Sequence, residues 1–446
     1  YVGGERLHGN REVKARPGCD SCHRVRLVTR CFHMGLADCV CGRLRDPVTP
    51  RIIHSMSSAA WGTPPWTVSL EIAPTALCSS YEVAVIGGGL TGLSAAYHLA
   101  RRGVGPVVLL EARRIGAGAS GRTGGIVLEG TAVGIYAGVD RCLPYLQQLV
   151  EENHIACDLQ LPGCWELRHE AIANEAQDAS LPPAPPRAKA AAKPSQGLCW
   201  RDDHSFLRPF QKVAGGTVDP GALLAGLARA ALAAGAELHE GAEVSCLEPK
   251  SPARLAVGSR TVRAQQVVVA LNAYTAKLLS LPVALHSALT LAVCTEPLPE
   301  ETLREMGLDP ALPFYTVDLP YLWGRTLERR QVIFGAGLIA GNPETLARIH
   351  IGRGRAAALM AQLEGRIRQL HPRLAGVRFS HRWAGPIGFT PQRTPILSRL
   401  PEAPNILVAA GCAGHGIALG VRLGALIAAA VALDEPLPHW GLLQPA

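Results

Sequence analysis

The clearest pattern in the chain is an apolar run, a glycine cluster and a helical stretch that follow one another between residues 82 and 110. Residues 82–86 form a short, mostly apolar run that is typical of a buried parallel strand. Residues 93–102 place apolar side chains at helical spacing, and 107–110 form a second buried strand that ends at Glu111. A strand, a helix and a strand of these lengths predict a βαβ unit, which is typical of an α/β fold.

The same kinds of pattern predict further elements along the chain. A helix rich in Ala and Leu follows Asp219-Pro220 and continues to about residue 234, where Gly235 ends it. Residues 177–197 are rich in Pro, Ala, Ser and Lys, which favours a surface loop or linker. The other expected strands are 237–239, 243–247, 267–270, 331–335 and 406–409, and the other expected helices are 356–370 and a segment from about residue 417.

The longest apolar region, residues 406–433, raises the question of a membrane span. It is interrupted by His415, Arg422 and several glycines, which favour a strand, a turn and a helix over a span. The N-terminal region shows no secretory signal, because it has no continuous apolar core before a small-residue cleavage site. We therefore expect no membrane span and a cytoplasmic location.

The first 55 residues differ from the rest of the chain. They lack periodicity and hold five of the 13 cysteines, and Met56 follows them as a plausible start. Our hypothesis is a leader over 1–55 with no fold of its own, followed by an N-terminal arm over 56–80. The alternative is a zinc site built on Cys19 and Cys22 with nearby Cys and His residues, although their spacing is irregular. We expect no metal elsewhere.

The net charge of +8 is concentrated in the same segment. Residues 1–55 contain ten Lys and Arg but five Asp and Glu, so the remaining chain is close to balanced. A nucleic-acid interface needs basic residues clustered on one folded face. No such cluster follows residue 56, and we expect no nucleic-acid partner.

The first motif that carries chemistry is the glycine cluster of residues 87–92, which reads GGGLTG. Gly87 permits the turn out of the strand, Gly89 lets the backbone approach a pyrophosphate, and Gly92 lets helix and strand pack closely. Phosphates bind well at a helix N-terminus, and Glu111 follows at the distance where an acid binds ribose hydroxyls. The motif predicts a dinucleotide site; the alternative is a glycine turn without a ligand.

Two more glycine-rich segments indicate which dinucleotide is bound. Residues 113–125 read RRIGAGASGRTGG, a length of glycine-rich chain that a nicotinamide enzyme does not need. Such a segment can offer backbone N–H groups to phosphates and to a flavin ring, or it can be a surface loop. Residues 409–417, AAGCAGHGI, predict a strand, a turn and a helix whose N-terminus would stabilise negative charge on a flavin.

With these motifs the chain resembles the D-amino-acid-oxidase-like family of FAD-dependent oxidoreductases, and within it the gamma-glutamylputrescine oxidase-like branch with the glycine and sarcosine oxidases. The resemblance covers about residues 81–433. Its markers are VIGGGLTGLSAAYHLA, IGAGASGRTGG, GGTVDPGALLAGLARAALAAGA, VVVALNAYT, TEPL, WAGPIGFTPQRTPIL and GCAGHGIALG.

The resemblance implies an α/β (α+β overall) protein with a Rossmann-like FAD-binding domain and a discontinuous second domain built on a mixed β-sheet. The FAD-binding domain would comprise 81–135, 208–280 and 378–440, and the substrate domain 136–207 and 281–377. A pocket between the two domains would hold the substrate.

The resemblance also implies cofactor contacts on the three glycine segments, at the adenine and along the cofactor. The implied residues are Gly87, Gly89, Leu90, Thr91, Gly92, Glu111, Ala112, Ala119, Ser120, Gly121, Arg122, Gly124, Val244, Ala270, Asn272, Gly411, Gly414, His415 and Gly416. The cofactor would be FAD, held non-covalently; Cys412 and Cys294 are candidates for covalent attachment by residue type alone.

Four residues are candidates for the reaction itself. His415 would hydrogen-bond the flavin or stabilise its turn, and Arg393 would bind a substrate carboxylate or brace its loop. Trp383 and Tyr321 would line the flavin or the substrate, or would belong to an aromatic core. Departures from the family pattern at Thr123, Gln392 and Cys412-Ala413 leave the substrate open.

The implied activity is oxidation of a CH–NH bond in a small amine, amino acid or polyamine derivative. Hydride would pass to flavin N5, and the imine would hydrolyse. Oxygen, a quinone or another electron carrier would reoxidise the flavin. The alternatives are a catalytically silent FAD-binding protein and an NAD-dependent dehydrogenase of the same βαβ type.

Overall fold

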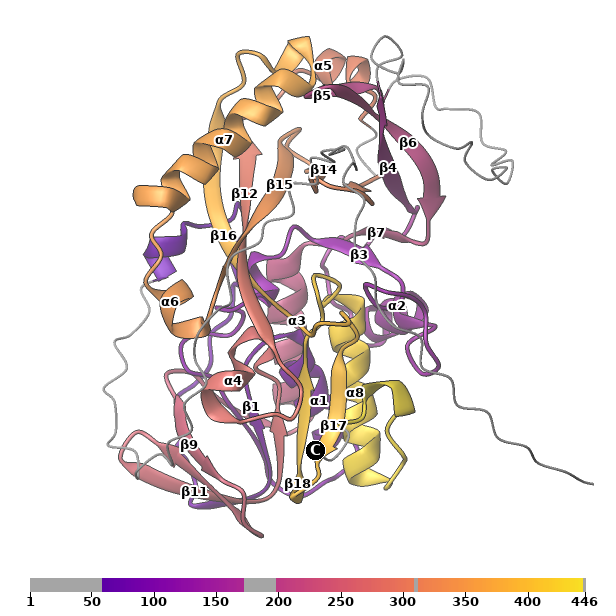
Figure 1. Ribbon diagram of the computed structural model, residues 1–446. Coiled ribbons are helices and arrows are strands. Elements are labelled where there is room, and N and C mark those ends of the chain that lie inside the picture. Colours follow the sequence, from indigo (N-terminus) through magenta and orange to yellow (C-terminus); the bar gives the residue numbers. More distant parts are fainter. Residues whose placement is uncertain (1–57, 172–197, 309–311, 444–446) are drawn as a thin grey trace, which may run out of the picture. The chain divides into compact units, whose positions relative to one another are not determined.

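The computed structural model describes residues 58–171, 198–308 and 312–443 (Figure 1). All of them belong to one of the two units into which the chain divides, Ser55–Ala446. The expected leader at 1–55, its zinc alternative and the expected loop at 177–197 lie outside the described residues. None of the described helices is both long enough and apolar enough to cross a bilayer.

One sheet has the strand order β17-β18-β11-β1-β2-β8. Strands β1, β2, β8, β11 and β18 pair in parallel, and β17 closes one edge in antiparallel orientation. The strands span Ser80–Ile86 (β1), Val107–Leu110 (β2), Glu237–His239 (β8), Arg260–Val269 (β11), Ile396–Leu400 (β17) and Ala403–Ala410 (β18). A hairpin of β9 (Val244–Glu248) and β10 (Ala253–Val257) extends from β11.

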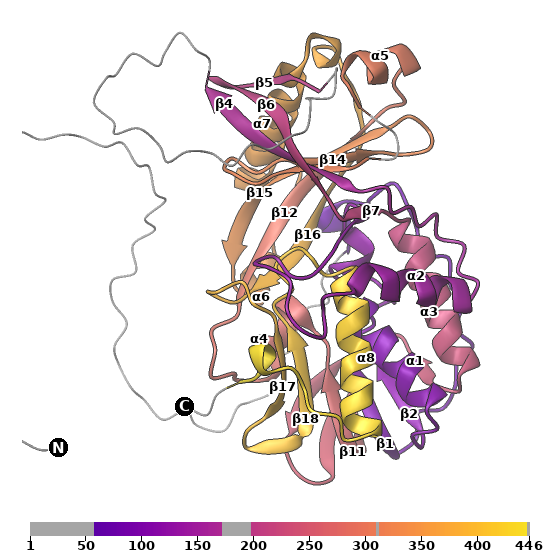
Figure 2. The same ribbon diagram turned by 90° about the vertical axis from the view of Figure 1, so that its right-hand side faces the viewer.

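Helices cover one face of this sheet (Figure 2). Alternate residues of β1, such as Val83 and Val85, share one buried cluster with these helices, while Ala84 and Ile86 face a second cluster shared with β9 and β10. The covering helices are α1 (Leu90–Arg101), α2 (Cys142–Glu152), α3 (Pro220–Ala233) and α8 (Ala418–Ala432). The predicted βαβ unit is therefore present, with α1 beginning three residues earlier than the apolar spacing indicated.

The second sheet has the order β16-β12-β15-β14-β13-β4-β6-β5 and is of mixed orientation. Its strands span Cys164–Ala171 (β4), Trp200–Asp202 (β5), Ser205–Val213 (β6), His286–Thr295 (β12), Phe314–Thr316 (β13), Trp323–Thr326 (β14), Val332–Gly341 (β15) and Phe379–Phe389 (β16). Helix α7 (Gly354–Leu370) packs on one face through a large apolar cluster. A small cluster with Trp383 and Trp323 lies on the other face.

Short elements connect the sheets. Strand β3 (Ile126–Leu128) pairs with β7 (Gly215–Thr217) as a separate two-stranded sheet. Helix α4 (Thr275–Leu278) follows β11, and the six-residue α5 (Glu300–Glu305) and five-residue α6 (Pro343–Ala347) lie around the second sheet.

Two strands of the second sheet lie partly or wholly in segments that the sequence assigns to the FAD-binding domain. Strand β6 (Ser205–Val213) spans residue 208, and β16 (Phe379–Phe389) lies within 378–440, yet both pair in the second sheet. The alternating side chains of β16 would suit either sheet, so the sequence does not say which sheet this strand joins. Its pairing with β12 places it in the second sheet. The division into domains stays a prediction at these boundaries.

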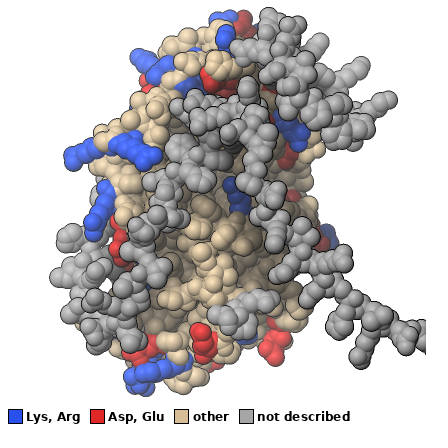
Figure 3. Space-filling view, in the orientation of Figure 1, with Lys and Arg blue, Asp and Glu red and all other residues tan. Residues whose placement is uncertain are grey.

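Charged residues are dispersed over the face of the molecule that Figure 3 shows. In the face shown in Figure 3, Lys and Arg lie mainly at the periphery and are interspersed with Asp and Glu. The centre of this face is largely uncharged where it is described.

Candidate functional site

The first glycine turn has the geometry that its sequence predicts. Gly87 has φ +113°, and its N–H donates to the carbonyl of Leu110 on β2 at 2.9 Å. A Cβ at Gly92 would collide with the carbonyl of Gly87, so helix and turn approach too closely for any other residue. Helix α1 begins directly after the turn, at Leu90, with its first N–H groups at the carboxyl end of β1.

Glu111 holds this turn from the neighbouring strand. Its Oε2 accepts from the N–H of Gly88 at 2.7 Å, and its Oε1 accepts from the N–H of Arg113 at 3.0 Å. Burial raises the pKa of Glu111, although the two backbone hydrogen bonds act in the opposite direction. A carboxylate offers about four lone-pair sites, so Glu111 keeps capacity for ligand hydroxyls.

The second glycine segment folds onto the first. Ser120 Oγ accepts from the N–H of Leu90 at 3.1 Å, and the N–H of Gly116 donates to the carbonyl of Gly88 at 2.9 Å. A Cβ at Gly89 would lie 2.9 Å from Ser120 Oγ. The segment is therefore packed against the N-terminus of α1 and is not a separate surface loop.

The third glycine turn is joined to the end of β11 by Asn272. This residue has φ +44°, and its Oδ1 accepts from the N–H groups of Gly411 at 2.9 Å and Cys412 at 3.3 Å. Ala270 lies beside the first turn, because a Cβ at Gly87 would come within 2.7 Å of the Ala270 carbonyl. The end of β11 thus brings the first and third turns together.

Three glycine segments that are far apart in sequence therefore meet at the carboxyl ends of β1, β11 and β18 (Figure 2). Ligands of open parallel sheets bind at this edge. Most other predicted cofactor residues lie on the same turns: Leu90, Thr91, Ala112, Ala119, Gly121, Gly124, Gly414 and Gly416. Val244 begins β9 close to Glu111, whose carbonyl accepts from the N–H of Ala242 at 2.8 Å.

Buried polar atoms without partners test whether a polar ligand fits here. Tyr274 Oη and His415 Nδ1 are buried and have no hydrogen-bond partner. Burial raises the pKa of Tyr274 to about 12 and lowers the pKa of His415. Tyr274 lies against the second segment, with a Cβ at Gly118 reaching 3.9 Å from its ring. Because buried polar atoms are normally satisfied, these groups fit a bound dinucleotide such as FAD.

Two predicted catalytic residues lie together. Arg393 Nη1 donates to Tyr321 Oη at 3.2 Å, and Arg393 has φ +59° in the turn between β16 and β17. The Tyr321 side chain is 36% exposed, so it lies at the surface and not in an aromatic core. Their place in the reaction stays a prediction.

Trp383 belongs to the small apolar cluster on one face of the second sheet, and its place in the reaction stays a prediction. It is fully buried, its Nε1 donates to the carbonyl of Arg122 at 2.9 Å, and Trp66 packs edge-on against it. The Arg122 side chain donates in turn to the carbonyls of Gly62 and Ala384, both at 3.0 Å. These contacts hold the second glycine segment against β16.

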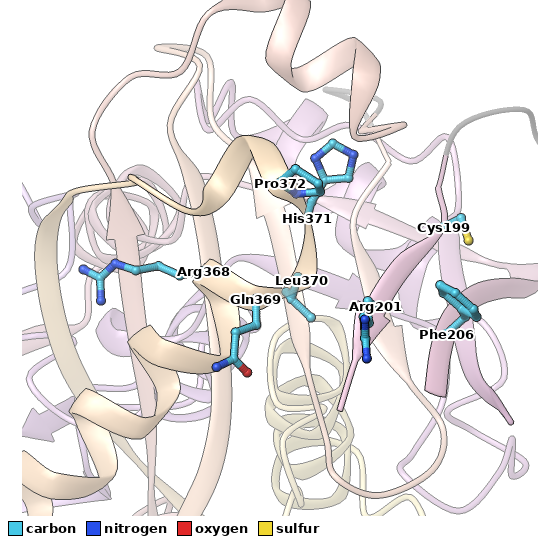
Figure 4. Close-up of a pocket in the computed structure, with 8 residues that line it drawn as sticks. All are labelled: Cys199, Arg201, Phe206, Arg368, Gln369, Leu370, His371 and Pro372. Atoms are coloured by element: carbon cyan, nitrogen blue, oxygen red, sulfur yellow. The ribbon is translucent and has the colours of Figure 1, made fainter. Parts of the chain in front are cut away.

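One surface pocket of about 410 Å³ lies elsewhere (Figure 4). Its lining residues come from β5, β6 and the C-terminal end of α7, and none of them is a predicted site residue: Cys199, Arg201, Phe206, Arg368, Gln369, Leu370, His371 and Pro372. Within the described ranges, no three His, Cys, Asp or Glu side chains are grouped to hold a metal ion.

Sequence reasoning missed two residues of this region, Tyr274 and Arg325. Arg325 is buried and Tyr274 is half-buried, and each has a buried polar atom without a hydrogen-bond partner. Tyr274 stood inside the quoted stretch VVVALNAYT, but nothing in the spacing marked its hydroxyl as unpaired. Arg325 follows the candidate residue Tyr321 by four positions, and no motif includes it.

The chain is similar to known oxidoreductases over most of its length. The chain is 28% identical to gamma-glutamylputrescine oxidoreductase of Escherichia coli K12, over 80% of the chain and 87% of that protein. It is 26% identical to 4-methylaminobutanoate oxidase (formaldehyde-forming) of Paenarthrobacter nicotinovorans, over 79% of the chain and 44% of that protein.

Solved structures share the fold. Glycine oxidase from Geobacillus kaustophilus superposes with a TM-score of 0.61 at 21% identity, covering 80% of the chain and 96% of that structure. The family model described as FAD dependent oxidoreductase matches residues 82–430, which is well over half of the sequence. The chain therefore belongs to the FAD dependent oxidoreductase family, also called DAO.

Proposed function

We propose that the chain binds FAD non-covalently and oxidises the CH–NH bond of a small amine or amino acid to an imine, which then hydrolyses. The observation that carries the proposal is the convergence of three glycine turns around the buried, unpaired atoms of Tyr274 and His415. The names of the two relatives lend support, since gamma-glutamylputrescine and 4-methylaminobutanoate are both amines.

The residues on the turns divide the binding of the cofactor among them. The N-terminus of α1 and the glycines before it would hold the pyrophosphate, and Glu111 would accept from ribose hydroxyls. The turn before α8, with Gly414, His415 and Gly416, would direct the positive end of a helix dipole at the flavin. FAD, when bound, supplies the hydride acceptor, and the chain supplies position and preorganised dipoles.

Non-covalent binding is favoured by the state of the two candidate cysteines. Both Cys412 and Cys294 are buried, and burial raises the pKa of each thiol to about 12. Since the thiolate is the nucleophilic form, neither thiol is activated for attack on a flavin.

The Arg393–Tyr321 pair would position the substrate. Both side chains extend from the region where β16 ends and β14 begins, and their hydrogen bond of 3.2 Å orients the phenol. An amine held with its C–H towards the cofactor needs such fixed groups more than it needs a general acid.

The first test is the colour of the purified protein. We expect flavin absorption bands that separate from the protein as free FAD after denaturation and filtration. Retention of the flavin on denatured protein would contradict non-covalent binding, and a folded, colourless protein that refuses added FAD would end the proposal.

The second test is anaerobic mixing with polyamines, N-methyl amino acids and glycine. We expect at least one compound to bleach the flavin, because hydride transfer to the flavin removes its visible absorption. Bleaching by none would favour the silent FAD-binding alternative. Hydrogen peroxide formed on readmission of air would identify oxygen as the acceptor; bleaching without peroxide would favour a quinone or another carrier.

A further inference from the structure

Four charged or titratable side chains of the second sheet and its helix α7 form one hydrogen-bonded group, called here the charged cluster. Its members are His169 of β4, Asp202 of β5, Asp318 of the loop between β13 and β14, and Arg366 of α7. Asp202 is at the centre, and its side chain is 4% exposed. A buried carboxylate needs partners because it has lost its hydration, so Asp202 depends on the cations around it.

Arg366 binds the β13–β14 loop as well as Asp202. Its Nε and Nη2 donate to the two carboxylate oxygens of Asp202 at 2.9 and 2.6 Å, which makes the pair bidentate. Its Nη1 donates to the carbonyl of Tyr321 at 2.8 Å, and Nη2 also donates to the carbonyl of Pro320 at 2.9 Å. Arg366 therefore fixes the loop backbone at Tyr321 relative to β5.

His169 ties the same loop to Asp202 through Asp318. Its Nδ1 lies 2.7 Å from Asp318 Oδ1, and its Nε2 lies 2.8 Å from Asp202 Oδ2. The backbone N–H of His169 also donates to Asp318 Oδ2 at 3.1 Å. Because Asp318 precedes Tyr321 in the same loop, the loop is held at two points, by His169 and by Arg366.

The contacts of His169 suit the charged form of its ring. A neutral imidazole has one donor nitrogen and one acceptor nitrogen, whereas an imidazolium has two donors. Both ring nitrogens face carboxylate oxygens, which accept and do not donate when ionised. Burial would raise the pKa of Asp202, but the hydrogen bonds from Arg366 and His169 outweigh it and lower the pKa. Asp202 is thus an anion at neutral pH, and only an imidazolium satisfies both contacts.

The strands around His169 bring no further charge to its ring. His169 pairs with Leu207 of β6. Its neighbours in β4, Arg168 and Glu170, project to the other face of the sheet, where Arg168 lies over the Phe210 ring. Of the residues that the structure describes, only the two carboxylates of the charged cluster lie within hydrogen-bond or ion-pair distance of the ring.

We propose that His169, as an imidazolium, is a positioning residue that holds the β13–β14 loop so that the phenol of Tyr321 stays on Arg393, and that loss of its proton loosens the loop. Tyr321 Oη accepts from Arg393 Nη1 at 3.2 Å. The affinity of the site for its substrate then depends on a histidine of another strand. The inference rests on the proposed function in this last step alone, because it takes the Arg393–Tyr321 pair to position the substrate.

Hydrogen–deuterium exchange of the FAD-saturated protein, read by mass spectrometry, measures the hold on the loop without turnover. The N–H of Val317 donates to the carbonyl of Leu167 at 3.1 Å, and the N–H of Leu322 donates to Thr316 Oγ1 at 2.9 Å. After correction for intrinsic exchange, protection of these two amides should be at least about tenfold higher at about pH 6 than at about pH 8.5, because neutral histidine loses a charge-assisted hydrogen bond. The amides of β1 are the reference for opening of the whole fold.

Substitution of His169 should remove this pH dependence. His169→Gln should show low protection of the loop amides at both pH values, because glutamine carries no charge. The matched control is His204→Gln, which should exchange as the parent does, since the His204 side chain is 78% exposed. If His169→Gln fails to fold, Asp318→Asn carries the test and should show the same loss, since the Asp318 side chain is 40% exposed. Equal protection at the two pH values in the parent, or unchanged protection in the variant that folds, overturns the proposal.

Anaerobic bleaching of the flavin connects the loop with the substrate. For the amine among the polyamines, N-methyl amino acids and glycine that bleaches at the lowest concentration, His169→Gln should raise the half-saturating concentration at least about threefold at about pH 6 and leave the limiting rate unchanged. In a Tyr321→Phe background the same substitution should add nothing, because residues that act through one contact are not additive. Additive effects would overturn the positioning role.

The two measurements fail separately. Bleaching by none of these amines would reject the proposed function, and with it the effect of His169 on substrate affinity, while the exchange data would still decide whether His169 holds the loop. Bleaching by an amine without pH-dependent protection of the loop would instead retain amine oxidation and overturn the role of His169.

Discussion

Single residues of the cofactor turns were readable from the sequence because few residue types fit them. Gly92 cannot carry a Cβ without striking the carbonyl of Gly87, and Gly87 itself has φ +113°. Such requirements are visible in the sequence as glycines at fixed spacing.

Gly89 gives the sharpest residue-scale prediction. Its φ of −86° and ψ of 179° are open to any residue, so Gly89→Ala should cause no backbone strain. The new Cβ would lie 2.9 Å from Ser120 Oγ, at the N-terminus of α1 where the pyrophosphate is expected. We expect FAD affinity to fall at least about tenfold while unfolding free energy changes by less than about 1 kcal/mol.

The control is Gly365→Ala in α7, where a Cβ would meet no atom within 4 Å. It should leave FAD affinity unchanged and stabilise the helix by about 1 kcal/mol. Fluorescence titration of FAD into the apoprotein measures both variants. Equal FAD affinity in Gly89→Ala and the parent would mean that the pyrophosphate does not approach this turn.

Arg325 and Tyr274 show what single-residue reasoning cannot find. Whether a guanidinium or a phenol is satisfied depends on which segments pack around it, and those segments are distant in sequence. The partner of Trp383 likewise lies 261 residues away. The sequence therefore could not predict that the Trp383 side chain holds the second glycine segment against β16.

Helices and strands with a clear hydrophobic pattern were predicted well. Strands whose length depends on pairing with a distant strand were predicted less well. The helix at 220–233 and the strand at 107–110 match their expected ranges closely, because Asp219, Gly235 and the apolar run mark them. Strand β15 continues to Gly341, beyond the expected end at 335, because it pairs with β12 along its length. Such pairing is not encoded locally.

One contact between helices gives an element-scale prediction about pH. His98 of α1 shares a hydrogen bond of 2.7 Å with Tyr145 Oη of α2, and Arg422 of α8 lies over the Tyr145 ring. Burial, with help from the nearby Arg102, lowers the pKa of His98 to about 4. The folded protein therefore binds fewer protons at His98 than the unfolded chain between pH 4 and 6.5.

Stability must consequently fall as the pH drops from 6.5 towards 4. The loss attributable to His98 should be about 1–3 kcal/mol at the acid end. In His98→Gln the acid-induced fall in melting temperature should be smaller, since glutamine does not titrate. His204→Gln is the control, because the His204 side chain is 78% exposed. If the melting temperature of His98→Gln fell with pH as steeply as that of the parent, His98 would not destabilise the fold in acid.

At the scale of the whole molecule, the sequence predicted two sheets only through the family resemblance. The βαβ unit is local, but the order β17-β18-β11-β1-β2-β8 joins strands from both ends of the chain. The second sheet likewise alternates between distant segments. Local sequence patterns do not give the order of strands in a sheet, because that order depends on how the whole chain connects them.

The N-terminal arm provides the prediction at this scale. Trp61 Nε1 donates to the carbonyl of Leu346 at 3.2 Å, and Gly62 bridges to Trp383 of β16. Trp66 Nε1 donates to the carbonyl of Gly121 at 2.9 Å. The arm thus touches both the second sheet and the second glycine segment, so its loss should disturb the cofactor site.

A chain that begins at Met56 should therefore keep FAD affinity and melting temperature, because it retains every contact of the arm. A chain that begins at Cys78, just before β1, should lose several degrees of melting temperature and most of its FAD affinity, since the buried faces of Trp61 and Trp383 become exposed. Thermal melting with and without FAD measures both. Loss of FAD from the Met56 chain would assign residues 1–55 a role in the fold and refute the leader hypothesis, whereas full binding by the Cys78 chain would make the arm dispensable.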